Sequence, residues 1–305
     1  MYVSLQQCMF LGMVTDSSLT SPQTCAPSEF HAEAPDRSRT TVTDPRGLTA
    51  FLVIAFAFSW TAWWLGTRLL GGADPMPAVI VGSFGPMVAA AVVTAATQGR
   101  KGVGALFRRH SLRRRGGVMP YLITVLVVLA LAGSAALQVY LGQSTLDEAQ
   151  LWAALPTLPV QFLVIALVGG GNEELGWRGF ALPRLQGVLS PLAANVLLGA
   201  VWAMWHAPLF AMPGTLQSQM YFPAYALLCV GFTVVLGHVF NSARGGVVAA
   251  IVTHAAINVV SGVKAVAVGD PASAPEVAMV ALLAVLLAVC TRGRLGLRRS
   301  DSARG

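Results

Sequence analysis

Long apolar stretches recur along the chain, and they limit what it can fold into more than any other feature. We place eight of them, at residues 48–70, 77–98, 118–142, 156–182, 190–210, 221–241, 246–263 and 276–291. Such lengths suit helices that cross about 30 Å of hydrocarbon. Backbone polar groups in lipid need partners within the chain, which a helix provides, and these stretches lack the alternation of barrel strands. The sequence therefore predicts an all-α fold, a polytopic membrane helix bundle with about eight transmembrane helices.

Charged residues are scarce, at 11% of the chain, whereas hydrophobic residues make up 55%. An ordinary soluble domain carries about 25% charged residues, because its surface faces water. This composition excludes a soluble globular enzyme and a disordered protein as the class of the whole chain. The cysteines form no CxxC pair and no metal-type spacing, so the sequence predicts no disulfide framework.

The basic residues gather on alternate loops. The loop between the second and third stretches contains basic residues and no acid: Arg100, Lys101, Arg108, Arg109, Arg113, Arg114 and Arg115. Arginines also dominate the segment after the last stretch. The opposite loops are mainly acidic, with Lys264 as their only base, and their acids are Asp74, Asp147, Glu148, Asp270 and Glu276. We expect an integral protein of the cell membrane. The positive-inside rule then predicts that both termini lie in the cytoplasm. We expect the basic loop to contact lipid headgroups and not nucleic acid.

The chain divides into three parts by composition. Residues 1–46 are polar, without a long apolar run, and are predicted to be a disordered leader, with a small helix on the membrane surface as the lesser option. Residues 47–292 form the transmembrane bundle, and residues 293–305 a basic cytoplasmic tail. The candidate functional residues all lie within the bundle, in a motif core at 156–262.

Three charged residues lie inside one apolar stretch, in the sequence Gly-Gly-Gly-Asn-Glu-Glu-Leu-Gly-Trp-Arg-Gly at 169–179. An ionisable residue in a span is costly unless it faces a partner or a wet cavity. Glu174 and Arg178 are four residues apart and suit an ion pair on one helix face. Glu173 is rotated by about 100° from Glu174 and points elsewhere. The simpler alternative is an ion-paired helix end at the cytoplasmic surface of the membrane. The glycine run before them predicts a kink, or simple helix packing.

Two histidines and an asparagine lie in later spans: His206 before Pro208, and His254 with Asn258 on one helix face. A carboxylate can take a proton from water, imidazoles can orient that water, and an amide can donate to an oxyanion. These residues therefore supply the parts for hydrolysis of an amide without a covalent nucleophile. A proton relay in a transporter and a non-catalytic immunity or scaffold protein stay open as alternatives. The sequence contains no HExxH, GxSxG or Gly-rich phosphate-binding motif.

These motifs together resemble the CAAX protease and bacteriocin-processing family, also called CPBP or Abi. The family includes the type II CAAX prenyl endopeptidases. The resemblance rests on Glu173-Glu174-x-x-x-Arg178, on the aromatic stretch ending in His206, and on His254-x-x-x-Asn258. It covers roughly residues 156–262. The second motif is often written Phe-x-x-x-His, and here Trp202 stands in place of the phenylalanine.

The resemblance implies an intramembrane endopeptidase that acts on a peptide or protein, with a lipidated or membrane-associated substrate as an open option. Glu173 would activate water, His206 would position it, and His254 with Asn258 would stabilise the oxyanion. Glu174, Arg178 and Trp202 would shape the site. The family is now usually described as glutamic proteases that need no metal; if zinc were bound, the ligands would be Glu173, His206 and His254. We expect an inward cavity that opens to the cytoplasm, with a sideways opening to lipid as a further option.

Overall fold

The computed structural model describes residues 47–69, 74–111 and 117–297. Within them the regular structure is helical, without a strand. The α-helices are α1 (Leu48–Leu69), α2 (Met76–Ser83), α3 (Gly85–Phe107), α4 (Met119–Tyr140), α5 (Glu148–Ala154), α6 (Leu158–Val168), α7 (Gly170–Gly176), α8 (Leu182–Gln186), α9 (Pro191–Trp205), α10 (Phe222–Ser242), α11 (Val248–Ala267) and α12 (Ala274–Cys290). The predicted leader, residues 1–46, lies outside the described residues, as do Arg113–Arg115 and the end of the tail from residue 298.

Seven helical stretches in the described residues are long and apolar enough to cross a membrane, at 48–69, 76–110, 119–140, 148–186, 191–211, 222–242 and 248–267. The shorter apolar helix α12 takes the place of the eighth. The predicted all-α, polytopic bundle is therefore confirmed. Two stretches run beyond their predicted bounds. The second continues past Gly99, where a positive φ of 62° kinks α3, and the fourth begins earlier with the short helix α5.

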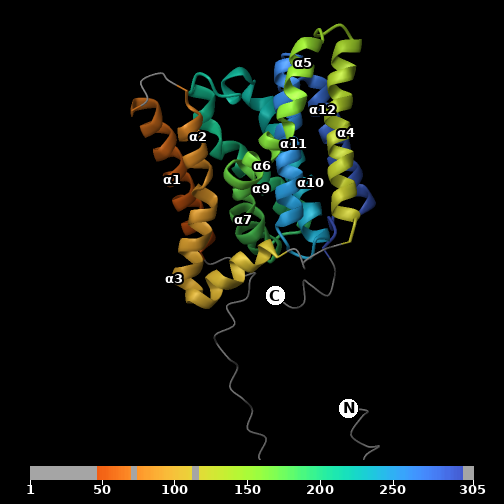
Figure 1. Ribbon diagram of the computed structural model, residues 1–305. Helices are drawn as coiled ribbons and strands as arrows, with labels where there is room; N and C mark the ends of the chain where they lie inside the picture. Colours follow the sequence, from red (N-terminus) through yellow and green to blue (C-terminus); the bar gives the residue numbers. More distant parts are fainter. Residues whose placement is uncertain (1–46, 70–73, 112–116, 298–305) are drawn as a thin grey trace, which may run out of the picture. The chain divides into compact units, whose positions relative to one another are not determined.

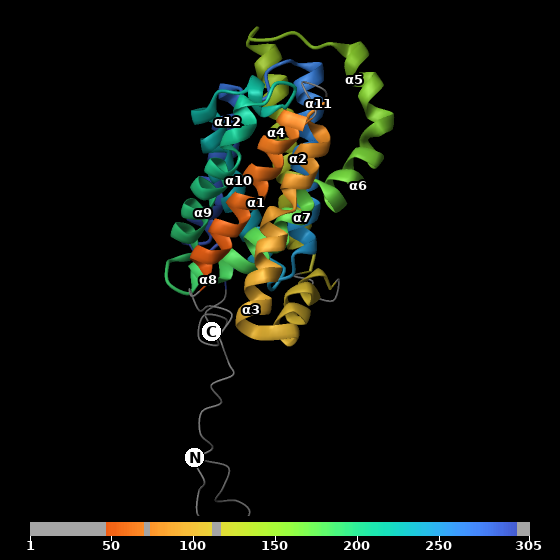
Figure 2. The same cartoon turned by 90° about the vertical axis from the view of Figure 1, so that its left-hand side faces the viewer.

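The helices cross the bundle in alternate directions (Figures 1 and 2). Close packing joins α9 to α10, α1 to α3, α10 to α12, and α4 to both α11 and α12. Helix α10 lies inside the bundle, since most of its residues are buried, whereas α6 has no buried residue. The start of α1 and the end of α12 lie at one end of the bundle (Figure 1). The connections from α1 to α2, α4 to α5, α9 to α10 and α11 to α12 lie at the other.

Glycines allow the helices that carry the motifs to approach their neighbours closely. A Cβ atom on Gly176 would lie 2.4 Å from the backbone oxygen of Pro86, so a larger residue would push α7 away from α3. A Cβ atom on Gly199 would lie 2.6 Å from the Cα of Val230, between α9 and α10. Small residues at such crossings are typical of membrane helices, where packing drives association. The motif-bearing helices are therefore fixed by backbone contact.

Two charges that the sequence pattern assigned to loops are buried instead. Lys264 is 4% exposed and Glu276 is 1% exposed. Their side chains form an ion pair that joins α11 to α12, and the ammonium group of Lys264 also donates to the Ser273 hydroxyl at 2.9 Å. The Ser273 side chain in turn accepts from the backbone N–H of Glu276 and caps α12. Their burial is tolerated because each charge has a partner.

Candidate active site

The helix that carries the acidic motif is broken on both sides of the carboxylates. Helix α6 ends at Val168, and Gly169 leaves helical geometry with φ −105° and ψ −138°. Helix α7 then begins, and a π-helical turn follows it at Trp177–Ala181. The predicted kink at the glycine run is therefore confirmed. Turns of π-helix are frequent at functional sites, because they rotate the side chains that follow.

The three charges of the motif lie inside the protein. Glu173 is 4% exposed, and Glu174 and Arg178 are fully buried. The predicted ion pair is present, since Arg178 Nη1 donates to Glu174 Oε1 at 2.9 Å. Arg178 Nη2 also donates to the hydroxyl of Thr233 on α10, at 3.2 Å. This burial contradicts the alternative of a charged helix end at the membrane surface.

Glu174 also binds His254, a contact that the sequence pattern did not indicate. His254 Nδ1 lies 2.7 Å from Glu174 Oε1. An ionised carboxylate only accepts hydrogen bonds, so Nδ1 carries the proton and Nε2 is left for other partners. The pair resembles the carboxylate–imidazole arrangement by which proteins fix the orientation of a functional histidine. Glu174 therefore links α7 to α11.

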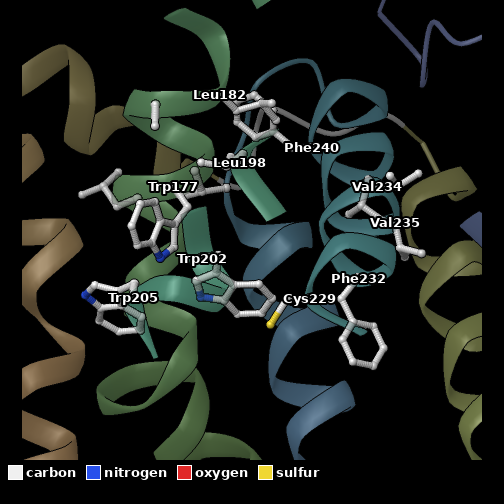
Figure 3. Packing of buried hydrophobic residues seen from close by; sticks show 14 of the residues in the cluster. Trp177, Leu182, Leu198, Trp202, Trp205, Cys229, Phe232, Val234, Val235 and Phe240 are labelled. Atoms are coloured by element: carbon white, nitrogen blue, oxygen red, sulfur yellow. The ribbon is translucent and has the colours of Figure 1, made fainter. Parts of the chain in front are cut away.

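Glu173 faces a different set of partners, as its rotation from Glu174 predicted. Its Oε2 accepts hydrogen bonds from the indole N–H of Trp202 at 2.9 Å and of Trp177 at 3.3 Å. Trp202 is on α9 and Trp177 is one turn beyond Glu173 on its own helix. Figure 3 shows the indole nitrogens of these two tryptophans turned toward each other. The sequence analysis named Trp202 as a site-shaping residue and did not single out Trp177, so it predicted neither of these two hydrogen bonds.

His206 stands directly after α9 and two residues before Pro208. Its Nδ1 lies 2.9 Å from the backbone carbonyl oxygen of Trp202. A carbonyl only accepts, so Nδ1 carries the proton and Nε2 keeps a lone pair. The ring centroid of Trp202 lies 5.3 Å from that of His206 and 5.3 Å from that of His254. One indole therefore contacts both imidazoles.

One cavity brings the predicted residues together. It has a volume of about 370 Å³ and is lined, among others, by Glu173, Trp202, His206, His254 and Asn258. The side chains of Tyr225 and Cys229 on α10 line it as well. No motif in the sequence pointed to these two, which lie in an apolar stretch. The cavity has a volume typical of ligand-binding pockets.

The cavity extends toward the end of the bundle that lies opposite the start of α1 and the end of α12. Its lining includes Thr215 and Gln217 from the connection between α9 and α10, and Pro271 from the connection between α11 and α12. Under the predicted topology this end faces away from the cytoplasm. The expectation of a cavity open to the cytoplasm and the expectation of cytoplasmic termini therefore cannot both be right.

Gly170 leaves the space that His254 and Asn258 occupy. A Cβ atom at this position would lie 2.5 Å from His254 Nε2 and 2.9 Å from Asn258 Nδ2. We expect Gly170→Ala to displace both groups and to reduce any activity of the site by at least about 100-fold, because small misplacements of reacting groups are costly. The activity measurement is paired with Gly262→Ala on α11, where the added methyl group meets no atom within 4 Å. Equal activities of the two variants would contradict this account of Gly170.

The residues named for a zinc alternative were compared with the arrangement that a metal ion requires. Within the described ranges no group of three or more His, Cys, Asp or Glu side chains is arranged to hold a metal ion. Glu173 Oε2 is engaged by two indoles, and His254 Nδ1 by Glu174. Glu173, His206 and His254 line one cavity, and in this structure they are not arranged as a set of three metal ligands.

Comparison with known proteins finds similarity in the part of the chain that carries this site. Residues 155–260 match the model of the type II CAAX prenyl endopeptidase Rce1-like family. This part of the chain is similar to the CAAX proteases. A curated relative, CAAX prenyl protease 2 of Methanococcus maripaludis, is 30% identical over 107 residues. That similarity covers 33% of this chain and 39% of the relative, so the chain spans about two fifths of the relative's length. The matched segment contains all the cavity residues that the motifs indicated.

Proposed function

We propose that this protein is an intramembrane endopeptidase that hydrolyses a peptide bond with water activated by Glu173. The observation that carries the proposal is the convergence of Glu173, His206 and His254 on one cavity. They come from α7, from the end of α9 and from α11, within a segment that matches a protease family. A pure binding protein would have little reason to bury ionisable groups at this cost.

The reaction begins with a water molecule between Glu173 and His206. The Glu173 carboxylate takes a proton from this water while the lone pair on His206 Nε2 orients it. The water oxygen attacks the carbonyl carbon and forms a tetrahedral intermediate with a negative oxygen. The protonated Glu173 then gives its proton to the amide nitrogen as the C–N bond breaks, so protons balance over the cycle.

His254 and Asn258 are proposed to stabilise the negative oxygen. The Asn258 amide donates from Nδ2, and His254, when doubly protonated, donates from Nε2 while Nδ1–H stays on Glu174. Donors that are already oriented in a site away from bulk water stabilise a developing charge strongly. No step uses a metal ion, so we propose a reaction that needs no cofactor. The substrate class is a membrane-associated peptide or protein segment, lipidated chains included.

Substrate trapping tests the proposal. Membranes of the native host that produce only the Glu173→Gln variant should accumulate an uncut protein, which purified wild-type protein then cuts at one bond. The new chain ends are identified by mass spectrometry of membrane protein termini. If the variant and wild-type membranes contain the same termini, the proposed peptidase function is wrong.

The side of the membrane from which substrate arrives is a separate prediction. If the basic loop is cytoplasmic, the cavity end of the bundle is not. In a variant without native cysteines, Gln219→Cys near the cavity should react with an impermeant maleimide on intact cells. Arg108→Cys, at the opposite end, should react only after lysis. Both side chains are exposed, so access to the reagent depends on the side of the membrane. The reverse pattern would show that the predicted topology is inverted.

A further inference from the structure

We propose that Trp202, assisted by Trp177, is a positioning residue that fixes the carboxylate of Glu173 by hydrogen bonds to one of its oxygens. The inference rests on the proposed function, since it assigns a role to the indoles through the proposed base. It concerns the chemistry of the two N–H groups and not the packing of the rings.

The two donors converge on a single carboxylate oxygen. Trp202 Nε1 lies 2.9 Å and Trp177 Nε1 lies 3.3 Å from Glu173 Oε2. Hydrogen bonds to an ionised group are shorter and stronger than those between neutral groups. Within the described residues no hydrogen bond involves Glu173 Oε1. The arrangement therefore engages Oε2 and leaves Oε1 as the oxygen that can take a proton from water.

The Trp202 ring is itself fixed by the rest of the site. The Arg178 guanidinium lies 5.2 Å from its ring centroid, within the range of a cation–π contact. The imidazoles of His206 and His254 lie edge-on against it, at 5.3 Å each. Because three charged or polar groups contact this ring, the direction of its N–H is set by the site. These contacts orient the Trp202 ring, and its N–H in turn orients the Glu173 carboxylate.

Trp202 can be compared with the phenylalanine that the resembled motif has at the same position. The motif of the resembled family often has phenylalanine at this position, which keeps an aromatic ring but has no donor. This chain thus adds an N–H group where the ring alone would satisfy packing. Trp205, on the same helix, differs from Trp202 in that its N–H makes no hydrogen bond to any described residue. Its indole N–H is buried and has no hydrogen-bond partner among the described residues, and Figure 3 shows its nitrogen turned away from those of Trp177 and Trp202.

Three substitutions of tryptophan by phenylalanine test the role, on the substrate found by trapping. Trp202→Phe should lower kcat by at least about 10-fold with KM within about twofold, because one hydrogen bond to a charged group is lost. Trp177→Phe, which removes the longer hydrogen bond, should lower kcat less. The double variant should fall below either. Trp205→Phe should keep kcat within about threefold, because its N–H donates to no group.

Three results would overturn the inference: wild-type kcat in Trp202→Phe, an equal fall in Trp205→Phe, or an effect confined to KM. Thermal unfolding checks that each variant is folded. If Trp202→Phe does not fold, 3-benzothienylalanine at this position keeps the bicyclic ring and replaces the N–H by sulfur, and the same comparison applies. Wild-type activity in Glu173→Gln would reject the proposed function itself. An inactive Glu173→Gln with a fully active Trp202→Phe would reject the positioning role alone.

Discussion

Replacing Glu173 by glutamine is expected to lower kcat/KM by about 10²–10⁴-fold, the contribution typical of a positioned base. Glutamine keeps the size of the side chain and can still accept a hydrogen bond from Trp202, but its amide cannot take a proton from water. The fold should survive, because removal of this charge leaves the Glu174–Arg178 pair intact. The measurement is the rate of substrate cleavage by purified protein in detergent or lipid.

Glu148→Gln is the matched control for this variant. Glu148 begins α5 on an exposed part of the chain and is not among the residues that line the cavity. The same chemical change there should leave kcat/KM within about twofold. Cleavage by Glu173→Gln at a rate close to that of Glu148→Gln would reject Glu173 as the base.

The second large effect concerns stability. Arg178→Met should lower the free energy of unfolding by about 3–5 kcal/mol, the usual cost of removing one partner of a buried ion pair. The Glu174 carboxylate, fully buried, would lose the hydrogen bond from Arg178 Nη1, and Thr233 would lose a donor. The fall is measured as a loss of folded protein and a lower unfolding temperature in detergent.

A double variant separates loss of the pair from loss of volume. Glu174→Gln combined with Arg178→Met removes both charges, so it should be more stable than Arg178→Met alone. Arg108→Met, on an exposed side chain, should change stability little. An unfolding temperature for Arg178→Met equal to that of Arg108→Met would show that the pair does not stabilise the bundle.

The sequence was sufficient for the fold class, because apolar stretches in lipid have few options other than helices. The sequence was less informative about features that depend on local backbone geometry or on how two helices pack. The helix through residue 99 continues after a kink that only the positive φ of Gly99 reveals. Lys264 and Glu276 looked like loop charges, because their pairing across α11 and α12 depends on how the two helices pack.

The sequence predicted which residues form the site, but not most of the contacts between them. Spacing along one helix correctly paired Glu174 with Arg178. Contacts between helices were missed, among them His254 with Glu174 and Trp202 with Glu173. Such contacts depend on the rotation and depth of each helix, which the break at Gly169 and the π-helical turn after α7 both change. Spacing rules for a regular helix do not contain these shifts.

The most direct test of the central claim follows the oxygen of the attacking water. Purified protein treated with a metal chelator cuts the trapped substrate in a single turnover in water enriched in oxygen-18. If Glu173 activates water for direct attack, the new carboxyl group carries one oxygen-18 atom in that first turnover. Unlabelled product in the first turnover would contradict the account, because the oxygen would then have come from the enzyme. Cleavage that stops with the chelator and returns with zinc would equally contradict it.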